Sequence, residues 1–276
     1  MSRPGIDPDA FNAFEAAAWE AQAEGYDRFF GAITSRVAEP LLDAAAVGDG
    51  TRTLDVATGP GYVAGQAAAR GAAVIGVDGA GAMIDLARRL QPGVDFRQGD
   101  AHALPFDDAA FDAVVANFLV LHLGRPEVAA GEFARVLAPG GRAALTAWDL
   151  PGKARFFGTI IDAVAEAGAT PPDDIPAGPD IFRFAADDEF DALLGAHGLV
   201  DRRVETVAFS HRVASADELW DGILGGTVRV SALIRGQPDD TYRRIRQAFD
   251  RRVEEFRGAD GLDLPVSVKL ASGRKP

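Results

Sequence analysis

A short apolar segment that ends in a glycine-rich turn constrains this chain more than any other feature. Residues 53–57 (TLDVA) lead directly into 58–61 (TGPG), and a helical pattern begins after them. A second apolar segment, 73–77, ends at Asp78. Chains with this arrangement place a nucleotide-like cofactor at the carboxyl ends of parallel strands. The turn therefore predicts a cofactor pocket, and the identity of that cofactor decides what the protein does.

Strands and helices are predicted to alternate strictly through the middle of the chain. An aromatic-rich helix after Asp7-Pro8 and a second helix over 32–46 come first, and apolar runs separated by helical patterns follow. This spacing indicates a parallel sheet with helices on both faces. The predicted strands are 52–57, 73–77, 94–98, 113–117 and 142–148, and the predicted helices are 62–70, 82–90 and 127–137. A turn is expected at 139–141, which reads Pro-Gly-Gly.

The pattern changes after the fifth predicted strand. A helix at 156–167 and a loop rich in Pro and Asp indicate an insertion, whereas a helix at 187–197 and a strand at 200–209 resume the fold. A capping box at 215–218 opens a second insertion that holds a long helix, 239–257, and a final strand is predicted at 264–271. We expect one domain over 1–276, with an N-terminal helical cap (1–46), an insertion (151–186) and a helical lid insertion (212–260). These additions are expected to cover the ligand crevice, because the loops after parallel strands gather at one edge.

Charge and composition narrow the possible partners. The formal net charge of −13 repels phosphate backbones and anionic membranes, so no nucleic-acid partner is expected. The chain contains no cysteine, which excludes disulfides, thiolate metal sites and cysteine nucleophiles, and no metal is expected. We find no leader pattern at the start and no apolar run of ~18 residues. The chain is therefore predicted to be cytoplasmic, without a membrane span, and a monomer or homodimer.

The turn itself distinguishes between cofactors. Residues 55–61 read D-x-A-x-G-x-G, whereas a dinucleotide fingerprint requires G-x-G-x-x-G. Ala57 replaces the first glycine, and the Asp55 carboxylate would repel a pyrophosphate but attract a cationic amino group. This combination suits the methionine part of S-adenosylmethionine (SAM). Gly59 and Gly61 allow close approach of the backbone, and the following helix N-terminus favours the methionine carboxylate.

Two further acidic residues fit the rest of SAM. Asp78 lies 23 residues after Asp55, at the end of the second predicted strand, where a carboxylate accepts hydrogen bonds from ribose hydroxyls. Asp100 follows the third strand, where it can accept from the adenine amino group while the Ala101 N–H donates to a ring nitrogen. A simple helix-capping role for Asp100 is the alternative. Residues 117–118 end the fourth strand, where the reactive centre is expected.

These segments resemble class I SAM-dependent methyltransferases. Besides 54–61 and 77–78, the resemblance rests on 99–106, 111–115 (FDAVV) and 132–141 (EFARVLAPGG), and it is strongest over 41–148. The chain is most similar to the small-molecule (type 11) group that includes ubiquinone and menaquinone biosynthesis enzymes. The resemblance implies an α/β, doubly wound, Rossmann-like sheet of seven strands, whose last strand, 264–271, runs antiparallel as a hairpin with 200–209.

The cofactor implied is SAM, which leaves as S-adenosylhomocysteine. At Tyr26 the resemblance implies a hydroxyl that reaches the SAM carboxylate, with an aromatic helix contact as the alternative. For Met83 helix packing is the alternative, and for His102 a plain loop position. The candidate cofactor-binding residues are Tyr26, Asp55, Ala57, Thr58, Gly59, Gly61, Asp78, Gly79, Met83, Asp100, Ala101, His102, Asn117 and Phe118.

The acceptor side of the pocket is less defined by sequence. His122 follows the fourth strand and is the candidate catalytic base for an acceptor hydroxyl, although a structural histidine bonded to backbone is the alternative. Four aromatic residues lie in segments expected to cap the crevice, and they suggest an apolar or aromatic acceptor, although core packing also explains such residues. These residues are Trp19, Phe30, Trp148 and Trp220.

The predicted reaction is transfer of a methyl group from SAM to an oxygen, nitrogen or carbon atom of a small molecule, by in-line substitution. Two alternatives stay open. An NAD(P)-dependent oxidoreductase would use the same fold but needs the missing glycine fingerprint. A non-catalytic SAM-binding protein would keep Asp55 and Asp78 with a closed acceptor pocket.

Overall fold

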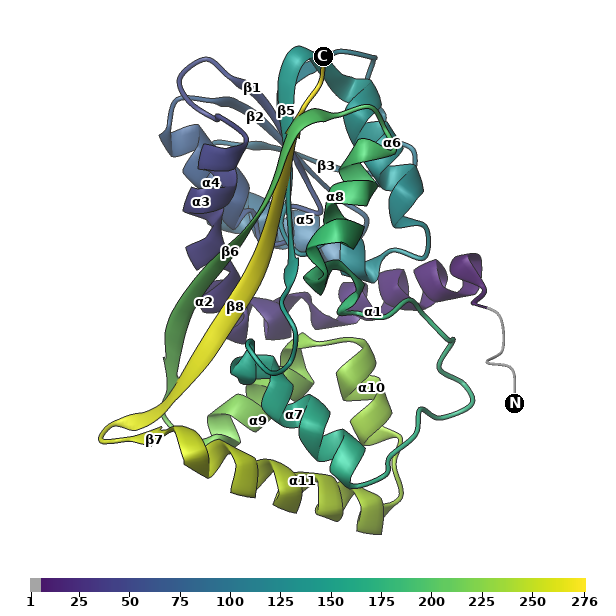
Figure 1. Cartoon of the computed structure of the whole chain (residues 1–276), viewed down its shortest axis with the longest axis vertical. Coiled ribbons are helices and arrows are strands. Elements are labelled where there is room, and N and C mark those ends of the chain that lie inside the picture. Colours follow the sequence, from purple (N-terminus) through teal and green to yellow (C-terminus); the bar gives the residue numbers. More distant parts are fainter. Residues whose placement is uncertain (1–5) are drawn as a thin grey trace.

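The computed structural model describes residues 6–276, and a single mixed sheet organises them (Figure 1). The strand order is β3-β2-β1-β4-β5-β8-β6, and the short β7 pairs with β8. Strands β1 to β5 are parallel, whereas β8 runs antiparallel to both β5 and β6. The predicted doubly wound fold with an antiparallel last strand is confirmed. The strands are β1 (Arg52–Val56), β2 (Ala73–Asp78), β3 (Asp95–Gln98), β4 (Phe111–Ala116), β5 (Leu137–Trp148), β6 (Val200–Val213), β7 (Arg257–Gly258) and β8 (Gly261–Arg274).

Helices cover both faces of this sheet. On one face α3 (Ala38–Ala44) and α4 (Tyr62–Ala69) pack on alternate side chains of β4, β5 and β8, and α5 (Gly81–Leu90) packs beside α4. On the other face α6 (Pro126–Val136) and α8 (Asp187–Gly195) bury Phe133 and Phe190. Each strand presents successive side chains to opposite faces of the sheet. Since helices cover both faces, both carry apolar residues, as is usual for parallel sheets.

A separate group of helices, which we call the helical layer, lies below the sheet in Figure 1. It consists of α7 (Arg155–Glu166), α9 (Ala216–Gly226), α10 (Arg229–Arg235) and α11 (Asp239–Val253). Strand β5 pairs with β8 only as far as Trp148 and Val268, so β6 and β8 continue beyond it as a two-stranded ribbon that reaches this layer. The capping box is present in α9, where the Ser215 hydroxyl accepts from the Glu218 N–H.

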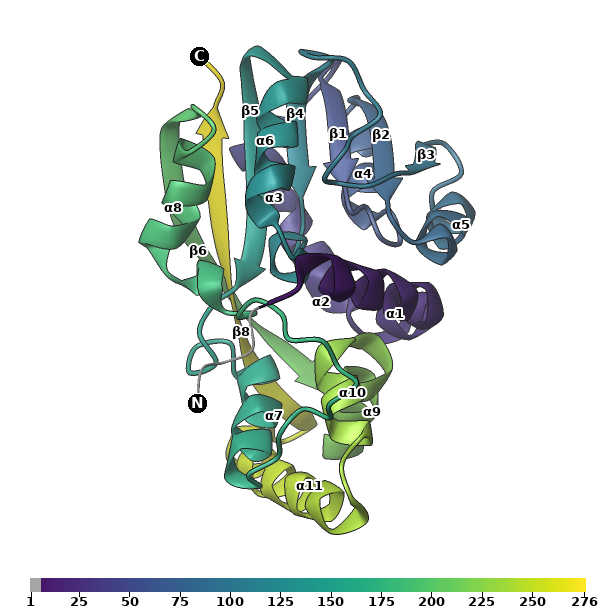
Figure 2. The same ribbon diagram turned by 90° about the vertical axis from the view of Figure 1, so that its right-hand side faces the viewer.

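Helix α1 (Pro8–Phe29) lies between the sheet and the helical layer (Figure 2). The Asp7 side chain caps it by accepting from the N–H groups of Asp9 and Ala10, as predicted from Asp7-Pro8. Phe11 and Glu15, four residues apart and therefore on one face, are buried. The helix thus presents one carboxylate to the interior among apolar side chains.

Some predicted elements differ from the structure. The helix expected over 32–46 is divided into α2 (Gly31–Thr34), a 3₁₀ turn (Ser35–Val37) and α3, because Pro40 has no N–H and fits only the first turn of a new helix. The turn expected at 139–141 lies inside β5, where the Gly140 N–H donates to the Lys275 carbonyl. Helix α10 was not predicted, and the helix expected over 239–257 ends at Val253.

Residues 1–5 of the expected N-terminal cap lie outside the described residues. Within 6–276, no helix combines the length and the apolar character that crossing a membrane requires.

Candidate active site

A cavity of about 680 Å³ opens at the carboxyl ends of β1, β2 and β4. Strands β1 and β4 are neighbours in the sheet, but the chain continues from β1 toward β2 and from β4 toward β5, in opposite directions. In open α/β folds, ligands bind in the crevice between two such strands. Most of the predicted site residues line this cavity together. They are Trp19, Tyr26, Asp55, Ala57, Thr58, Gly59, Asp78, Gly79, Met83, Asp100, Ala101, His102, Asn117, Phe118 and His122.

The glycine-rich turn has a left-handed backbone at three positions. Gly59 has a φ of 52° and Gly61 a φ of 81°, and Ala57 has a φ of 57°, although it carries a side chain. Gly61 plays a packing role, because a Cβ there would lie 2.8 Å from the Phe96 ring. This glycine therefore lets α4 approach β3 closely, and it is not among the residues that line the cavity.

Asp55 is buried with one unsatisfied oxygen. Its Oδ2 accepts from the Thr58 hydroxyl at 2.7 Å and from the Ala64 N–H at 3.1 Å, whereas Oδ1 is buried and has no hydrogen-bond partner among the described residues. Burial raises the pKa of this carboxyl to about 7. A cationic group beside Oδ1 would satisfy the oxygen and favour the charged form, so the residue fits the ammonium group of SAM.

Asp78 organises the neighbouring turn. Its Oδ2 accepts from the Gly59 N–H at 2.9 Å, and its Oδ1 accepts from the Ala80 N–H at 3.0 Å. Burial raises the pKa of Asp78 as well. Because each carboxylate oxygen can accept a second hydrogen bond, the side chain can hold the β1 turn and still receive two hydroxyl groups.

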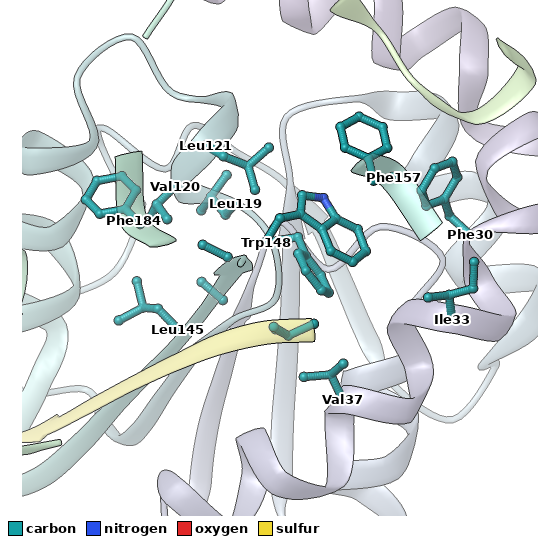
Figure 3. Close-up of a cluster of buried hydrophobic side chains, with 14 of the residues drawn as sticks. Phe30, Ile33, Val37, Leu119, Val120, Leu121, Leu145, Trp148, Phe157 and Phe184 are labelled. Atoms are coloured by element: carbon teal, nitrogen blue, oxygen red, sulfur yellow. The ribbon is translucent and has the colours of Figure 1, made fainter. Parts of the chain in front are cut away.

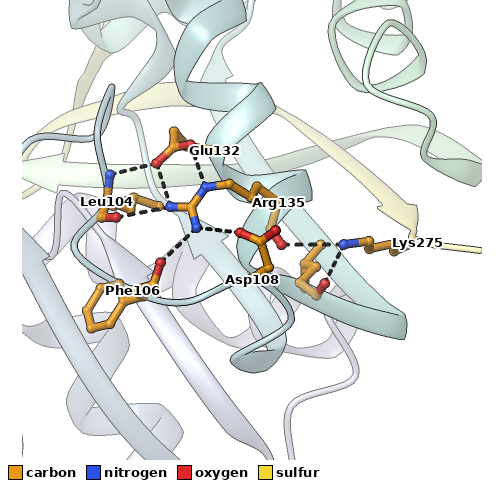
Figure 4. Close-up of polar contacts among 7 residues, drawn as sticks. Leu104, Phe106, Asp108, Glu132, Arg135 and Lys275 are labelled. Carbon is orange, nitrogen blue, oxygen red and sulfur yellow. Dashed lines mark hydrogen bonds and ion pairs between the residues drawn. The ribbon is translucent and has the colours of Figure 1, made fainter.

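The segment after β3 is held in place by α6 (Figure 4). Arg135 donates to the carbonyls of Leu104 and Phe106 and forms ion pairs with Glu132 and Asp108, while Glu132 accepts from the Leu104 N–H. The EFAR motif singled out in the sequence therefore has a structural explanation: it anchors the loop that carries the adenine-side candidates.

Asp100, at the start of that loop, makes a local turn. Its Oδ1 accepts from the His102 N–H and lies 2.8 Å from His102 Nδ1 as well. The side chain is 65% exposed, at the cavity edge. No helix begins here, so Asp100 is not a helix cap, and its contact with adenine stays a prediction.

Asn117 connects three parts of the chain. Its Nδ2 donates to the Thr34 carbonyl, and its Oδ1 accepts from the Thr146 hydroxyl, which in turn accepts from the Phe118 N–H. Phe118 has a φ of 57°, and its ring lies against Trp148 with 4.2 Å between centroids. These contacts fix the backbone at the end of β4 and place the Phe118 ring against Trp148.

A smaller cavity of about 60 Å³ adjoins the first and shares Trp19, Tyr26, Phe118 and His122 with it. Its wall is mainly apolar and includes several aromatic rings: Figure 3 shows Trp148 beside Phe157, with Phe30 nearby. The Trp148 and Phe157 rings are stacked with centroids 6.2 Å apart. Three of the predicted acceptor-pocket residues, Trp19, Phe30 and Trp148, line this cavity.

Trp220 lies elsewhere. It packs against Tyr242 and Phe249 inside the helical layer, so the structure places it outside the pocket that it was expected to line. The physical reason is that α9 packs against α1 through Gly222 and Gly226, which leaves Trp220 facing α11. A sequence pattern predicts that a helix has an apolar face but not the partner that this face meets.

His122 meets a residue that sequence reasoning did not select. Its Nδ1 lies 2.9 Å from Glu15 Oε2, which also accepts from the Trp19 indole N–H at 3.1 Å. Tyr26, on the same helix, donates to the Thr34 hydroxyl, and burial raises its pKa to about 12. A signal for Glu15 was present, since it is an acid four residues before Trp19 on an otherwise apolar helix face.

Comparison with known proteins places this arrangement in a class. The family described as "Methyltransferase domain" matches residues 54–145. A demethylmenaquinone methyltransferase of Renibacterium salmoninarum is 34% identical over 157 residues, which cover 55% of this chain and 65% of that protein. The enzyme of the same name from Thermus thermophilus is 44% identical over 111 residues, 38% of this chain and 50% of that protein. The chain thus spans between half and two thirds of these relatives.

Solved structures share the fold at low identity. Phosphoethanolamine N-methyltransferase 2 of Haemonchus contortus, in complex with SAM, superposes with a TM-score of 0.57 at 17% identity, over 100% of this chain and 61% of that one. The YcgJ protein from Bacillus subtilis has a TM-score of 0.57 at 20% identity, over 87% and 98% of the two chains.

The glycine turn, the acidic residues near the carboxyl ends of β1 and β2, and the strand order define a Rossmann-like methyltransferase fold. The match over residues 54–145 is to a methyltransferase domain, which agrees with the resemblance to SAM-dependent methyltransferases predicted from the motifs.

Proposed function

We propose that this chain transfers the methyl group of SAM to a small, apolar or aromatic acceptor. The observation that carries the proposal is the continuity of the two cavities, because Asp55 and Asp78 line the larger one while His122 and Phe118 line both. Cofactor and acceptor groups would thus meet near the end of β4. A cytoplasmic location, a monomeric or dimeric state, and the division into cap, insertion and lid stay predictions.

SAM supplies an electrophilic methyl group on a sulfonium with an excellent leaving group. The task of the chain is therefore to hold donor and acceptor in line and to exclude water, which contributes up to ~7–11 kcal/mol. Asp55 would bind the ammonium, and Asp78 would bind the ribose. Helix α1 and the helical layer would cover the acceptor, so that the reaction proceeds away from solvent.

An aromatic or apolar acceptor is favoured by the lining of the smaller cavity. Trp148, Phe157 and Phe118 offer flat apolar surfaces, and aromatic rings recognise planar ligands through stacked and edge contacts. The relatives named demethylmenaquinone methyltransferase are consistent with such an acceptor. His122 would act as a base where the acceptor must lose a proton, which contributes ~10²–10⁴-fold.

Calorimetric titration with SAM, S-adenosylhomocysteine and NAD tests the proposal. We expect both sulfur compounds to bind and NAD to leave the signal unchanged, because the carboxylate of Asp55 opposes a pyrophosphate. Binding of NAD without binding of SAM would instead identify the oxidoreductase alternative. SAM binding without methylation of any offered ring compound would favour the non-catalytic alternative.

A further inference from the structure

The environment of Glu15 is unusual for a carboxylate. Its side chain comes from the middle of α1, and the residue is 3% exposed. A buried carboxylate is costly unless it is paired and hydrogen-bonded. Three groups compensate for it here: the Trp19 indole N–H, the His122 ring, and Arg229, whose Nε lies 3.3 Å from Oε1 in an ion pair.

Arg229 closes the far side of this cluster. It is the first residue of α10, and it donates to the carbonyls of Leu121 and Pro179. Its guanidinium also lies over the Phe11 ring, 5.1 Å from the centroid. The backbone next to His122, helix α1 and the helical layer therefore meet at Glu15, which fixes the position of that carboxylate.

The two oxygens of Glu15 have different surroundings. Oε2 receives both the Trp19 donor and the His122 ring, whereas Oε1 faces Arg229 and has no partner in hydrogen-bond geometry among residues 6–276. Since a carboxylate only accepts, the His122 nitrogen beside it must carry the proton. This places a proton on Nδ1 and leaves Nε2 as the unprotonated nitrogen of the neutral ring.

The orientation of the ring matters because His122 lines both cavities. Trp19 packs edge-on against the imidazole, with ring centroids 5.1 Å apart, which limits its rotation. A histidine that a carboxylate holds in one tautomer, and whose ring lines a ligand cavity, is suited to general-base catalysis.

We propose that Glu15 is a positioning residue: it holds His122 in the Nδ1–H tautomer, so that Nε2 takes the proton from a ring hydroxyl of a planar, phenol-type acceptor. This inference rests on the proposed function. A base is needed only where the acceptor must lose a proton, and the aromatic cavity next to His122 suits a flat ring. A hydroxyl on such a ring meets both requirements.

The step balances as follows. The hydroxyl oxygen forms a bond to the methyl carbon while the sulfur–carbon bond breaks. The electron pair of the broken bond stays on sulfur. The hydroxyl proton passes to His122 Nε2 and then to solvent. The products are an aryl methyl ether, S-adenosylhomocysteine and one proton.

Nitrogen-15 NMR of histidine-labelled protein at about pH 8 tests the first part, with the His122 signal assigned by its loss in His122→Gln. We expect the Nδ1–H tautomer in the unchanged protein and the Nε2–H tautomer in Glu15→Leu. Glu15→Gln should retain Nδ1–H, because the amide oxygen can still accept. Glu24→Gln is the matched control, since Glu24 lies on the same helix in an exposed pair with Arg89 and should leave the His122 signal unchanged.

Methylation of 1,2-dihydroxybenzene and 1,4-dihydroxynaphthalene tests the second part. We expect Glu15→Leu to lower kcat on the order of 10²-fold, with partial rescue in Glu15→Gln and with the Kd for SAM within about twofold. The positioning role would be overturned by an Nε2–H tautomer in the unchanged protein. It would also be overturned if Glu15→Leu kept the Nδ1–H tautomer. SAM binding without methylation of either diol would overturn the acceptor chemistry, whereas failure to bind SAM would overturn the proposed function itself.

Discussion

The affinity for SAM should fall as the pH is lowered through 7, because of Asp55. Burial raises the pKa of this carboxyl from 3.8 to about 7, so that the free protein is about half protonated there at neutral pH. The ammonium of SAM is attracted only to the charged form. When a ligand binds only one form of a group, its apparent Kd equals the intrinsic Kd divided by the fraction of protein in that form.

The size of the effect follows from the pKa of about 7. The apparent Kd is multiplied by about 2 at pH 7, about 11 at pH 6 and about 33 at pH 5.5, relative to the fully ionised protein. Affinity should therefore weaken about 5.5-fold between pH 7 and 6 and about 16-fold by pH 5.5. An α-amino group with a pKa near 7.7–8.0 stays protonated over this range, so the ligand contributes little to the slope.

Calorimetry in two buffers of different ionisation enthalpy measures both the Kd and the accompanying proton release, about half a proton at pH 7. Asp55→Asn should bind SAM at least ~10-fold more weakly and lose most of the slope, because its amide does not titrate. Asp85→Asn, an exposed carboxylate on α5, is the control and should keep the slope. A flat pH profile in the unchanged protein, or an equal slope in Asp55→Asn, would refute the role of Asp55. The Asp55→Asn variant is essential because the pKa of Asp78 is raised too, and its titration has to be distinguished from that of Asp55.

Three other changes have definite expected outcomes. Asp78→Ala should weaken SAM binding by ~10-fold or more, as measured by calorimetry, and unchanged affinity would contradict the ribose role. Ala57→Gly should raise the free energy of unfolding by up to about 1 kcal/mol in urea titration, because its φ of 57° is a backbone region that glycine adopts without strain; a clear loss of stability would count against that reading. Arg135→Ala should lower the Tm and also weaken SAM binding, because the loop that contains Leu104 and Phe106 loses its anchor. A lower Tm with unchanged SAM affinity would show that this loop does not contribute to SAM binding.

Much of the fold and of the cofactor side could be predicted from the sequence, because both depend on local patterns. The alternation of apolar runs with helical periods predicts the parallel strands, and carboxylates at the ends of successive strands, such as Asp55 and Asp78, come together at one edge of a sheet. Gly59 and Gly61 predict a tight turn at which the backbone approaches closely, whereas the positive φ of Ala57 is known only from the structure. These features need only the spacing of residues close together in the chain.

The acceptor side required the tertiary structure. Glu15 and His122 are 107 residues apart, and they meet only because α1 docks between the sheet and the helical layer. The same docking decides that Trp148 faces a cavity while Trp220 is buried against α11. A sequence pattern shows that a helix has an apolar face, but the packing partner of that face depends on the fit of whole elements, and the tertiary structure alone decides it.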